Sequence, residues 1–389
     1  MAGYAKKKHY EAIVIGAGAT GMAAGYFLAK RGVSVLLIDA YDPPHANGSH
    51  HGDTRIIRHA YWMGDAYVPL ALRARKLWAE LARATGCELF AQTGVLRFGE
   101  AGSASLRDQV EIGERYAIPV EPLSADAVAR RWPGLRLPDG MAGVFEPEAG
   151  VLSAESCVLA CRLHAEANGA HLLVNAPVRH VRIGPDFATV ETATGAFTAD
   201  RLVVTAGAWT GRLLDGLQLP LRVMRRTVGW FEADPKLYGA GETQASFPAF
   251  IGSGEQGEFY GFPSIRGSGI KLGRHDGDRP IDPDGTIAPF GEADERELRG
   301  FLEEYFPQAA KGRLLRSAVC KYTVTPDEHF IVDRHPAHPH VWIGSACSGH
   351  GFKFASAVGE MLAQLASGAP SVLDRSAFAL SRTGLRHIL

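Results

Sequence analysis

The sequence predicts an α/β protein of two domains, one built on a parallel sheet and one of mixed α+β structure. Residues 12–39 run from an apolar strand through a glycine-rich turn and a small-residue helix to a second apolar strand. Another apolar strand, residues 202–205, also ends in small residues. The segments at about 91–150 and 223–319 are richer in Pro, Gly and aromatic residues, which favours an inserted α+β domain.

The composition is that of an ordinary globular protein. The chain has 389 residues, of which 46% are hydrophobic and 21% charged, with a net charge of −1. This balance argues against nucleic acid as a partner, because phosphate-binding surfaces are strongly basic. No apolar run has membrane-spanning length, and we recognise no secretory signal before Glu11, so we expect a cytoplasmic protein. The cysteines are scattered and odd in number, which does not predict a disulfide framework: Cys87, Cys157, Cys161, Cys320 and Cys347.

The first strand–turn–helix–strand unit carries the pattern GxGxxG in GAGATG. Gly16 allows the tight turn, Gly18 lets backbone approach a pyrophosphate, and Gly21 lets the helix pack closely on the strand. The free N–H groups at the helix N-terminus would bind the same anion. Strand 33–38 ends in Asp39, which is placed to bind ribose hydroxyls. The unit predicts a Rossmann-like dinucleotide-binding domain and leaves NAD and FAD both open.

The last third of the chain contains a further strand–turn–helix pattern at residues 340–368. Gly349 and Gly351 would leave the N-terminus of a helix that starts near Phe352 open to a ligand, and the helix dipole would stabilise negative charge on a flavin. The predicted nucleotide-binding domain is discontinuous and comprises residues 1–90, 151–222 and 320–389. The predicted substrate domain comprises residues 91–150 and 223–319.

Four long motifs are more specific than the glycine pattern. They are GSHHGDTRIIRHAY at 48–61, YGFPS with GIKLGRH within 260–275, CKYTVTPDEHFIVD at 320–333 and SGHGFKF at 348–354. In these motifs the chain resembles the monomeric sarcosine oxidase family, which also contains N-methyltryptophan oxidase and has the D-amino-acid-oxidase-like fold. The resemblance extends over essentially the whole chain. It implies an FAD-binding Rossmann-like domain and an α+β substrate domain with a mixed antiparallel sheet.

The resemblance implies a covalent cofactor and four cationic site residues. Cys320 matches the cysteine that carries FAD through a thioether to the 8α-methyl group. Arg58 and Lys353 match the residues that bind the substrate carboxylate, and a planar guanidinium suits this task because it binds a carboxylate through two hydrogen bonds. Lys271 matches the lysine that activates oxygen, where a cation would stabilise superoxide. Arg55 matches an arginine beside the flavin ring.

Other matched positions belong to the expected pocket. His275, Tyr260 and Tyr322 match substrate-pocket residues, and a histidine near neutral pH can share the proton of an amine. The resemblance also assigns three further residues to the cofactor: His51, Thr54 and Val178. At the pocket wall Ile251 stands where sarcosine oxidases carry a larger methionine. The shorter side chain would admit N-methyl amino acids bulkier than sarcosine, or cyclic ones such as proline.

The implied activity is the oxidation of sarcosine, or of a related secondary amino acid, by O2. Hydride transfer from carbon to flavin N5 would lead to glycine, formaldehyde and hydrogen peroxide. Two alternatives stay open: a flavin dehydrogenase that passes electrons to a protein or quinone, and a non-catalytic or NAD-binding protein. We expect a monomer, since 389 residues suffice for a self-contained subunit. We expect no metal, because four clustered histidines fit no ordinary ligand spacing: His45, His50, His51 and His59.

Overall fold

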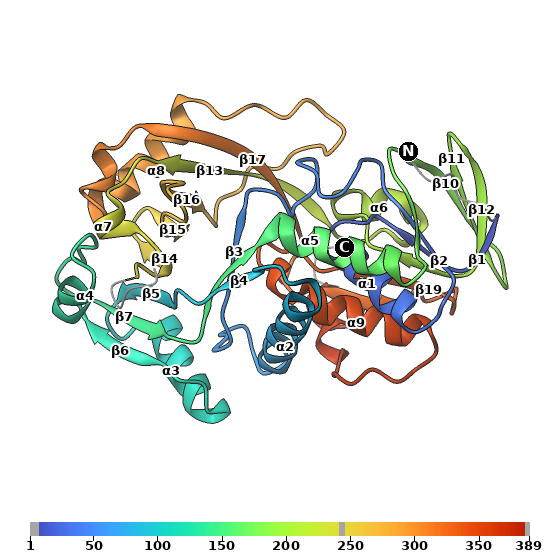
Figure 1. Ribbon diagram of the computed structural model, residues 1–389, viewed down its shortest axis with the longest axis horizontal. Helices are drawn as coiled ribbons and strands as arrows, with labels where there is room; N and C mark the ends of the chain where they lie inside the picture. Colours follow the sequence, from blue (N-terminus) through green and yellow to red (C-terminus); the bar gives the residue numbers. More distant parts are fainter. Residues whose placement is uncertain (1–7, 241–245, 386–389) are drawn as a thin grey trace.

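The computed structural model describes residues 8–240 and 246–385, which form two large sheets and one small sheet (Figure 1). The first sheet contains β1 (His9–Ile15), β2 (Val35–Ile38), β9 (His171–Leu173), β10 (Val178–Ile183), β11 (Ala188–Thr192), β12 (Gly195–Val204), β18 (Ile331–Arg334) and β19 (Val341–Ser345). The second sheet contains β5 (Val95–Glu100), β6 (Glu121–Ser124), β7 (Met141–Glu146), β13 (Arg222–Phe231), β14 (Ala249–Gly254), β15 (Gly257–Phe262), β16 (Ile270–Arg274) and β17 (Leu314–Val324). The small sheet contains β3 (Thr54–Ile57), β4 (Phe90–Ala91) and β8 (Gly150–Ser153).

Helices and short 3-10 turns connect these strands. The α-helices are α1 (Ala19–Lys30), α2 (Tyr67–Thr85), α3 (Ala104–Tyr116), α4 (Ala125–Arg131), α5 (Ala154–Ala167), α6 (Thr210–Leu213), α7 (Pro235–Tyr238), α8 (Glu292–Tyr305) and α9 (Ala355–Ala366). The short 3-10 turns are η1 (Gly207–Trp209), η2 (Asp215–Leu217), η3 (Ala309–Lys311), η4 (Phe352–Phe354), η5 (Ser376–Phe378) and η6 (Thr383–Leu385). None of the described helices combines the length and the apolar character that a membrane span requires.

The first sheet is organised around β1. It pairs in parallel with β2 on one side and with β12 on the other, and β12 pairs in parallel with β19. Ile13, Val14 and Ile15 are buried, as expected for a parallel strand that is covered on both faces. Helix α1 packs against both α5 and α9 on one face of this sheet. The carboxyl ends of β1, β2, β12 and β19 therefore meet at one edge of the sheet.

The second sheet has the strand order β17–β13–β16–β15–β14–β5–β7–β6. One of its faces packs on α8 through aromatic side chains, including Phe259 and Phe301, whose ring centroids are 4.3 Å apart. Because side chains alternate along a strand, the other face of β15 carries Glu258, Tyr260 and Phe262. This other face borders the cavity that is described below.

The predicted fold class is confirmed: a parallel sheet with packed helices is combined with a mixed, largely antiparallel sheet. The small sheet connects the two, and β3 leads directly into the segment that carries Arg58. The predicted boundary at residue 320 falls inside β17, which pairs with β13 along its whole length. Cys320 is therefore carried by the second sheet.

Two elements begin later than the sequence suggested. Strand 33–38 begins at Val35, because Gly32, with a φ of +79°, belongs to the turn that follows α1. The helix expected near Phe352 opens with the 3-10 turn η4, and α9 begins at Ala355. Asp39 still follows β2 directly, at the position that the sequence suggested.

Candidate active site

A cavity of about 580 Å³ lies where the carboxyl edge of the first sheet meets the second sheet. Its lining includes most of the residues that the sequence singled out: Gly16, Gly18, Asp39, Arg55, Arg58, Val178, Ile251, Tyr260, His275, Cys320, Tyr322, Gly349, Gly351 and Lys353. Four predicted residues are not part of the lining: Gly21, His51, Thr54 and Lys271. The volume is that of a site for a small molecule or cofactor.

The glycine turn forms one end of the cavity. Gly16 has a φ of +87°, and a Cβ there would lie 2.6 Å from the Cα of Ala206, so only glycine fits. At Gly21 a Cβ would overlap the backbone oxygen of Gly16, which explains the close packing of α1 on β1. Gly18 has more open surroundings, because a Cβ there would have Nδ1 of His50 as its nearest neighbouring atom, at 3.5 Å. The turn thus presents backbone to the cavity and suits a pyrophosphate.

Asp39 lies beside this turn at the end of β2. One carboxylate oxygen accepts a hydrogen bond from the backbone N–H of Ala17 at 2.8 Å, and the other from that of Tyr41 at 2.9 Å. The second oxygen also lies 3.2 Å from His45 Nε2. Asp39 therefore holds the two loops together while it lines the cavity, and Val178 lines the cavity too.

Arg55 fixes the loop that precedes β3. Its guanidinium donates to the backbone oxygens of Ser49 at 2.9 Å, His51 at 2.6 Å and Thr54 at 2.7 Å. His51 lines a smaller neighbouring cavity together with Trp230, and its pKa is lowered to about 4 by burial and by the charge of Arg55. The loop is thus shaped by a cation that itself lines the cavity.

Lys271 binds the same loop from β16. Its Nζ donates to the backbone oxygens of Gly52 at 2.5 Å and Thr54 at 3.2 Å, and it lies 3.1 Å from Thr54 Oγ1. The side chain is only 2% exposed. Burial and the neighbouring charge of Arg55 lower the pKa of Lys271 to about 7. The lysine is therefore a buried cation one layer behind the cavity lining.

Arg58 and Lys353 lie over one aromatic ring. The guanidinium carbon of Arg58 is 4.3 Å and the Nζ of Lys353 4.9 Å from the ring centroid of Tyr61. Both cations are almost completely buried, at 5% and 6% exposed. Burial and the charge of Arg58 lower the pKa of Lys353 well below its usual value. Two loops that are far apart in the sequence thus bring two positive groups to one place.

A cluster of rings lines the cavity near Cys320. The hydroxyl of Tyr322 donates to that of Tyr260 at 3.4 Å, and the imidazole of His275 lies 5.8 Å from the Tyr322 ring and 6.3 Å from the Tyr260 ring. Burial lowers the pKa of His275, so the ring is neutral at neutral pH. Gly349 makes room for this cluster, because a Cβ there would lie 2.9 Å from Cε1 of His275.

Cys320 is buried in β17, directly across from Arg226 on β13. Its side chain packs with Val228 and Trp230. Burial raises the pKa of the thiol, whereas the charges of Arg55 and Lys271 act in the opposite direction. The thiol faces a cavity that carries positive charge.

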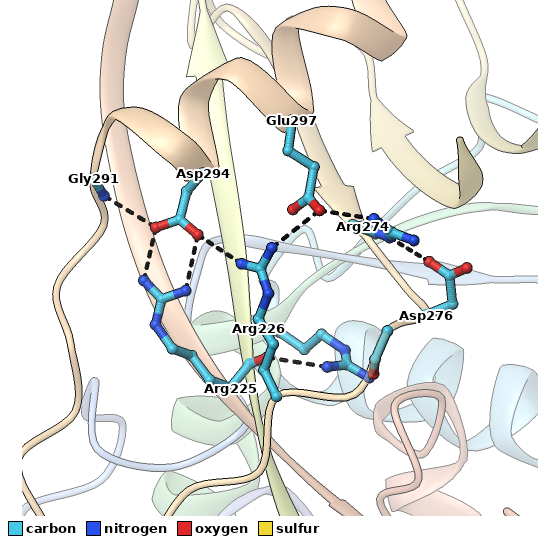
Figure 2. A network of polar contacts seen from close by, with 9 residues as sticks. Arg225, Arg226, Arg274, Asp276, Gly291, Asp294 and Glu297 are labelled. Atoms are coloured by element: carbon cyan, nitrogen blue, oxygen red, sulfur yellow. Dashed lines mark hydrogen bonds and ion pairs between the residues drawn. The ribbon is translucent and has the colours of Figure 1, made fainter. Parts of the chain in front are cut away.

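Strands β13 and β16, which lie beside the ring cluster of Tyr260, His275 and Tyr322, are joined to α8 by a network of ion pairs (Figure 2). Arg225 forms two hydrogen bonds to Asp294, at 2.8 and 2.9 Å. Arg274 joins Asp276 at 2.6 Å and Glu297 at 2.7 Å. Arg226 donates to the backbone oxygen of His275 at 2.9 Å, so this network fixes the backbone that carries the imidazole.

The structure adds residues that the sequence did not reveal. The ring of Tyr61 contacts both Arg58 and Lys353. Glu258 lines the cavity and forms an ion pair with Arg97 at 2.8 Å. The position of Glu258 was available from the sequence, because it lies two residues before Tyr260 on a strand and so shares its face. Of the remaining predicted residues, Ile251 on β14 lies opposite Tyr260 on β15, and Gly351 packs against the backbone of Ala346.

The clustered histidines lie in separate surroundings. His45 and His50 have ring centroids 4.9 Å apart, whereas His59 is paired with Glu146. In residues 8–240 and 246–385, no group of three or more His, Cys, Asp or Glu side chains is arranged to hold a metal ion.

Comparison with known proteins gives the family. The chain matches the model of the DAO family, FAD-dependent oxidoreductases, over residues 11–365. It is 49% identical over 386 residues to a monomeric sarcosine oxidase of Bacillus sp. (strain B-0618), covering 98% of each chain. It is 40% identical over 377 residues to an N-methyl-L-tryptophan oxidase of Escherichia coli (strain SMS-3-5 / SECEC), covering 96% of this chain and 99% of the relative. The structure of L-proline dehydrogenase from P. horikoshii is similar in fold, with a TM-score of 0.84 at 23% identity over 96% of this chain and 97% of the other.

These matches confirm the resemblance that the four motifs carried. They also exclude the non-catalytic and NAD-binding alternative, because the matched family consists of FAD-dependent enzymes. The chain belongs to the DAO family of FAD-dependent oxidoreductases, in the group of the monomeric sarcosine oxidases and N-methyl-L-tryptophan oxidases.

Proposed function

We propose that the protein is an FAD-dependent oxidase of sarcosine and related N-methyl or secondary amino acids, with O2 as the electron acceptor. For sarcosine the net reaction is sarcosine + O2 + H2O → glycine + formaldehyde + H2O2, which balances in atoms and electrons. The full-length identity with monomeric sarcosine oxidases supports the reaction type. The geometry of two buried cations, described next, supports the substrate class.

The observation that carries the proposal is that two basic groups, Arg58 and Lys353, are buried over the same ring without an acidic partner among the described residues. Arg58 donates to the backbone oxygen of Ala60 at 3.3 Å, and Lys353 donates to that of His350 at 2.7 Å. Among the described residues neither cation has an acidic partner within ion-pair distance. Buried cations need a counter-charge, and an α-carboxylate held between the two would supply it. A guanidinium and an ammonium together would also fix the orientation of the carboxylate.

The amine of the substrate must lose a proton before its C–H bond can be oxidised. His275 is a neutral imidazole, because burial lowers its pKa, and it can accept this proton or share it. Tyr260 and Tyr322 close the same part of the cavity with their rings and hydroxyls. In this proposal they position the amine beside His275.

The residues present fit FAD. Gly16, Gly18 and Asp39 would hold the nucleotide, since the turn offers open backbone and a carboxylate at the strand end. When bound, FAD would supply the two-electron acceptor for C–H oxidation and the route of electrons to O2. We extend the proposal to Val178, which lines the cavity, and to His51 and Thr54, which lie in the loop directly behind the lining residue Arg55. Arg55, whose guanidinium holds the loop of His51 and Thr54, would lie near the ring.

Covalent attachment of FAD through Cys320 is part of the proposal. The thiol lines the same cavity as the glycine turn and lies in a field set by Arg55 and Lys271. Burial raises the pKa of the thiol on balance, and both cations reduce this rise and so help the thiolate, the reactive form of cysteine, to form. The matched position in the motif CKYTVTPDEHFIVD gives the further support.

The choice of acceptor depends on Lys271. A buried cation beside the cavity can stabilise the negative charge that O2 acquires with its first electron, which favours an oxidase. The alternative is a dehydrogenase that passes electrons to a protein or quinone. We also propose that the protein acts as a monomer in the cytoplasm, in keeping with the name of its monomeric relatives.

Anaerobic reduction of the purified holoprotein tests the proposal. Sarcosine added under nitrogen should bleach the flavin absorbance, and air admitted without any other acceptor should restore it within the time of one turnover. Colour that returns only when a quinone or a protein acceptor is added would support the dehydrogenase instead. Absorbance that neither sarcosine nor any N-methyl amino acid bleaches would refute both.

A further inference from the structure

The wall of the cavity formed by β15 carries a carboxylate, Glu258, that no step of the proposed reaction uses. Glu258, Tyr260 and Phe262 alternate with core residues along this strand, and all three line the cavity. The register places Tyr260 opposite Ile251 on β14, and Ile251 opposite Arg97 on β5. Glu258 therefore belongs to the same wall as the proposed substrate-pocket residues.

Arg97 holds Glu258 in place as a charged group. Glu258 Oε2 accepts a hydrogen bond from Arg97 Nη2 at 2.8 Å and one from Ser253 Oγ at 3.4 Å. Arg97 is 3% exposed, and in the described part of the chain its acidic partner is Glu258, so the carboxylate neutralises a cation buried in the sheet. Burial lowers the pKa of Arg97 to about 10, which leaves the guanidinium protonated at neutral pH. The ion pair is therefore a fixed part of the wall.

The second carboxylate oxygen of Glu258 is available to a ligand. The described residues form no hydrogen bond to Oε1, and 27% of the side chain remains exposed where it lines the cavity. A group that enters the cavity therefore meets a charged acceptor that lacks a donor. A hydrogen-bond donor would satisfy this oxygen, whereas a second carboxylate would lie beside like charge.

Glu258 shares its part of the cavity with the cations that would hold the α-carboxylate. The charges of Arg58, Arg97 and Glu258 all act on the pKa of Tyr61, which burial raises to about 12. The backbone N–H of His275 also donates to the backbone oxygen of Glu258, at 2.8 Å. A ligand anchored at Arg58 therefore lies in the same part of the cavity as Glu258.

We propose that Glu258 is a specificity-determining residue, and that it selects N-methyl or secondary amino acids whose side chain donates a hydrogen bond, such as an amide or a hydroxyl. This inference rests on the proposed function, because it concerns the choice among substrates of that reaction. Amino acids with an acidic side chain are disfavoured, since their carboxylate would approach Glu258. Sarcosine has no side chain and serves as the reference substrate.

The test compares N-methyl-L-glutamine with N-methyl-L-glutamate, which match in size and differ in charge and donor capacity. For each protein variant, kcat/KM is divided by the value that the same variant shows with sarcosine. We expect the wild type to favour the glutamine derivative about tenfold or more, and Glu258→Gln to favour it less than about threefold. The double variant Arg97→Met/Glu258→Met removes both charges without leaving one unpaired, and it should lose the preference as well.

A matched control keeps the test specific. Glu255→Gln removes an exposed carboxylate from the turn between β14 and β15, and it should keep the wild-type preference. Equal use of both derivatives by the wild type, or a preference that survives in Glu258→Gln and in the double variant, would overturn the role of Glu258. Failure of the wild type to oxidise sarcosine and every N-methyl amino acid would instead overturn the proposed function.

Discussion

His59 and Glu146 form a fully buried pair, with Nδ1 of the imidazole 2.7 Å from Oε1 of the carboxylate. The same carboxylate accepts the backbone N–H groups of His59 at 2.7 Å and Ala60 at 3.2 Å. Glu146 at the end of β7 thus fixes the backbone immediately after Arg58. Three donors compensate a carboxylate that has no access to solvent.

Glu146→Gln should therefore weaken both the fold and the carboxylate site. The amide keeps one acceptor oxygen but places an NH2 group against a backbone donor, which costs about 1–3 kcal/mol in the free energy of unfolding. The variant should also displace Arg58, so KM for sarcosine should rise by a larger factor than kcat falls. Denaturant unfolding and steady-state kinetics measure the two effects. Glu148→Gln, at an exposed position two residues further on, is the control, and equal behaviour of the two variants would contradict this role.

Lys353→Met should remove one half of the carboxylate site. Methionine keeps the length of the side chain and loses the charge, so kcat/KM for sarcosine should fall roughly 100-fold. The loss should appear mainly in KM, because the ammonium binds a group that does not react. Lys311→Met, at an exposed position, should leave both constants unchanged. A Lys353→Met enzyme with wild-type KM would show that the lysine does not bind the substrate.

Much of this site was predictable from the sequence, for reasons that are local. The GAGATG turn, the acid that follows β2 and the motif cysteine are defined by neighbours in the chain. The parallel sheet brings the turn and the acid to one edge, whereas Cys320 reaches the same cavity from β17 of the second sheet. Asp39 shows the limit of such reasoning, because the ribose contact expected of it gave no sign that its oxygens also bind Ala17 and Tyr41.

The unpredicted residues depend on contacts between distant segments. Glu146 meets His59, and Arg97 meets Glu258, because separate strands bring them together. Charged residues that are buried in a sheet carry no periodic signal, since their partners lie far away in the sequence. The contact of the Tyr61 ring with both Arg58 and Lys353 could not be recognised either, because Lys353 lies far from Tyr61 in the sequence.

The colour of the acid-precipitated protein tests the attachment at Cys320. Flavin should remain in the pellet after denaturation in acid, and it should move to the supernatant in Cys320→Ser. Cys347→Ser is the matched control, because this second thiol also lines the cavity and should leave the flavin in the pellet. Flavin in the wild-type supernatant would remove Cys320 from its role as the attachment site.

The reaction with O2 should depend on the protonation of Lys271. Its pKa is lowered from the ordinary 10.5 to about 7, so the cation is present below about pH 7 and lost above it. The rate of the oxygen reaction should therefore fall as the pH rises through 7. Stopped-flow reoxidation from roughly pH 5.5 to roughly pH 9 measures this, because a single titration spans about two pH units around its pKa.

Two variants separate Lys271 from other titrating groups. Lys271→Met should react slowly with O2 at every pH, whereas the exposed Lys236→Met should keep the wild-type profile. A wild-type rate in Lys271→Met would assign the oxygen reaction to a different group.

The most direct measurement follows O2 consumption, formaldehyde and hydrogen peroxide together while the purified protein turns over sarcosine. The proposed oxidase consumes one O2 and releases one formaldehyde and one hydrogen peroxide for each sarcosine, with no added acceptor. Formaldehyde that forms only with an added quinone or protein acceptor, without O2 uptake, would contradict the oxidase and identify a dehydrogenase.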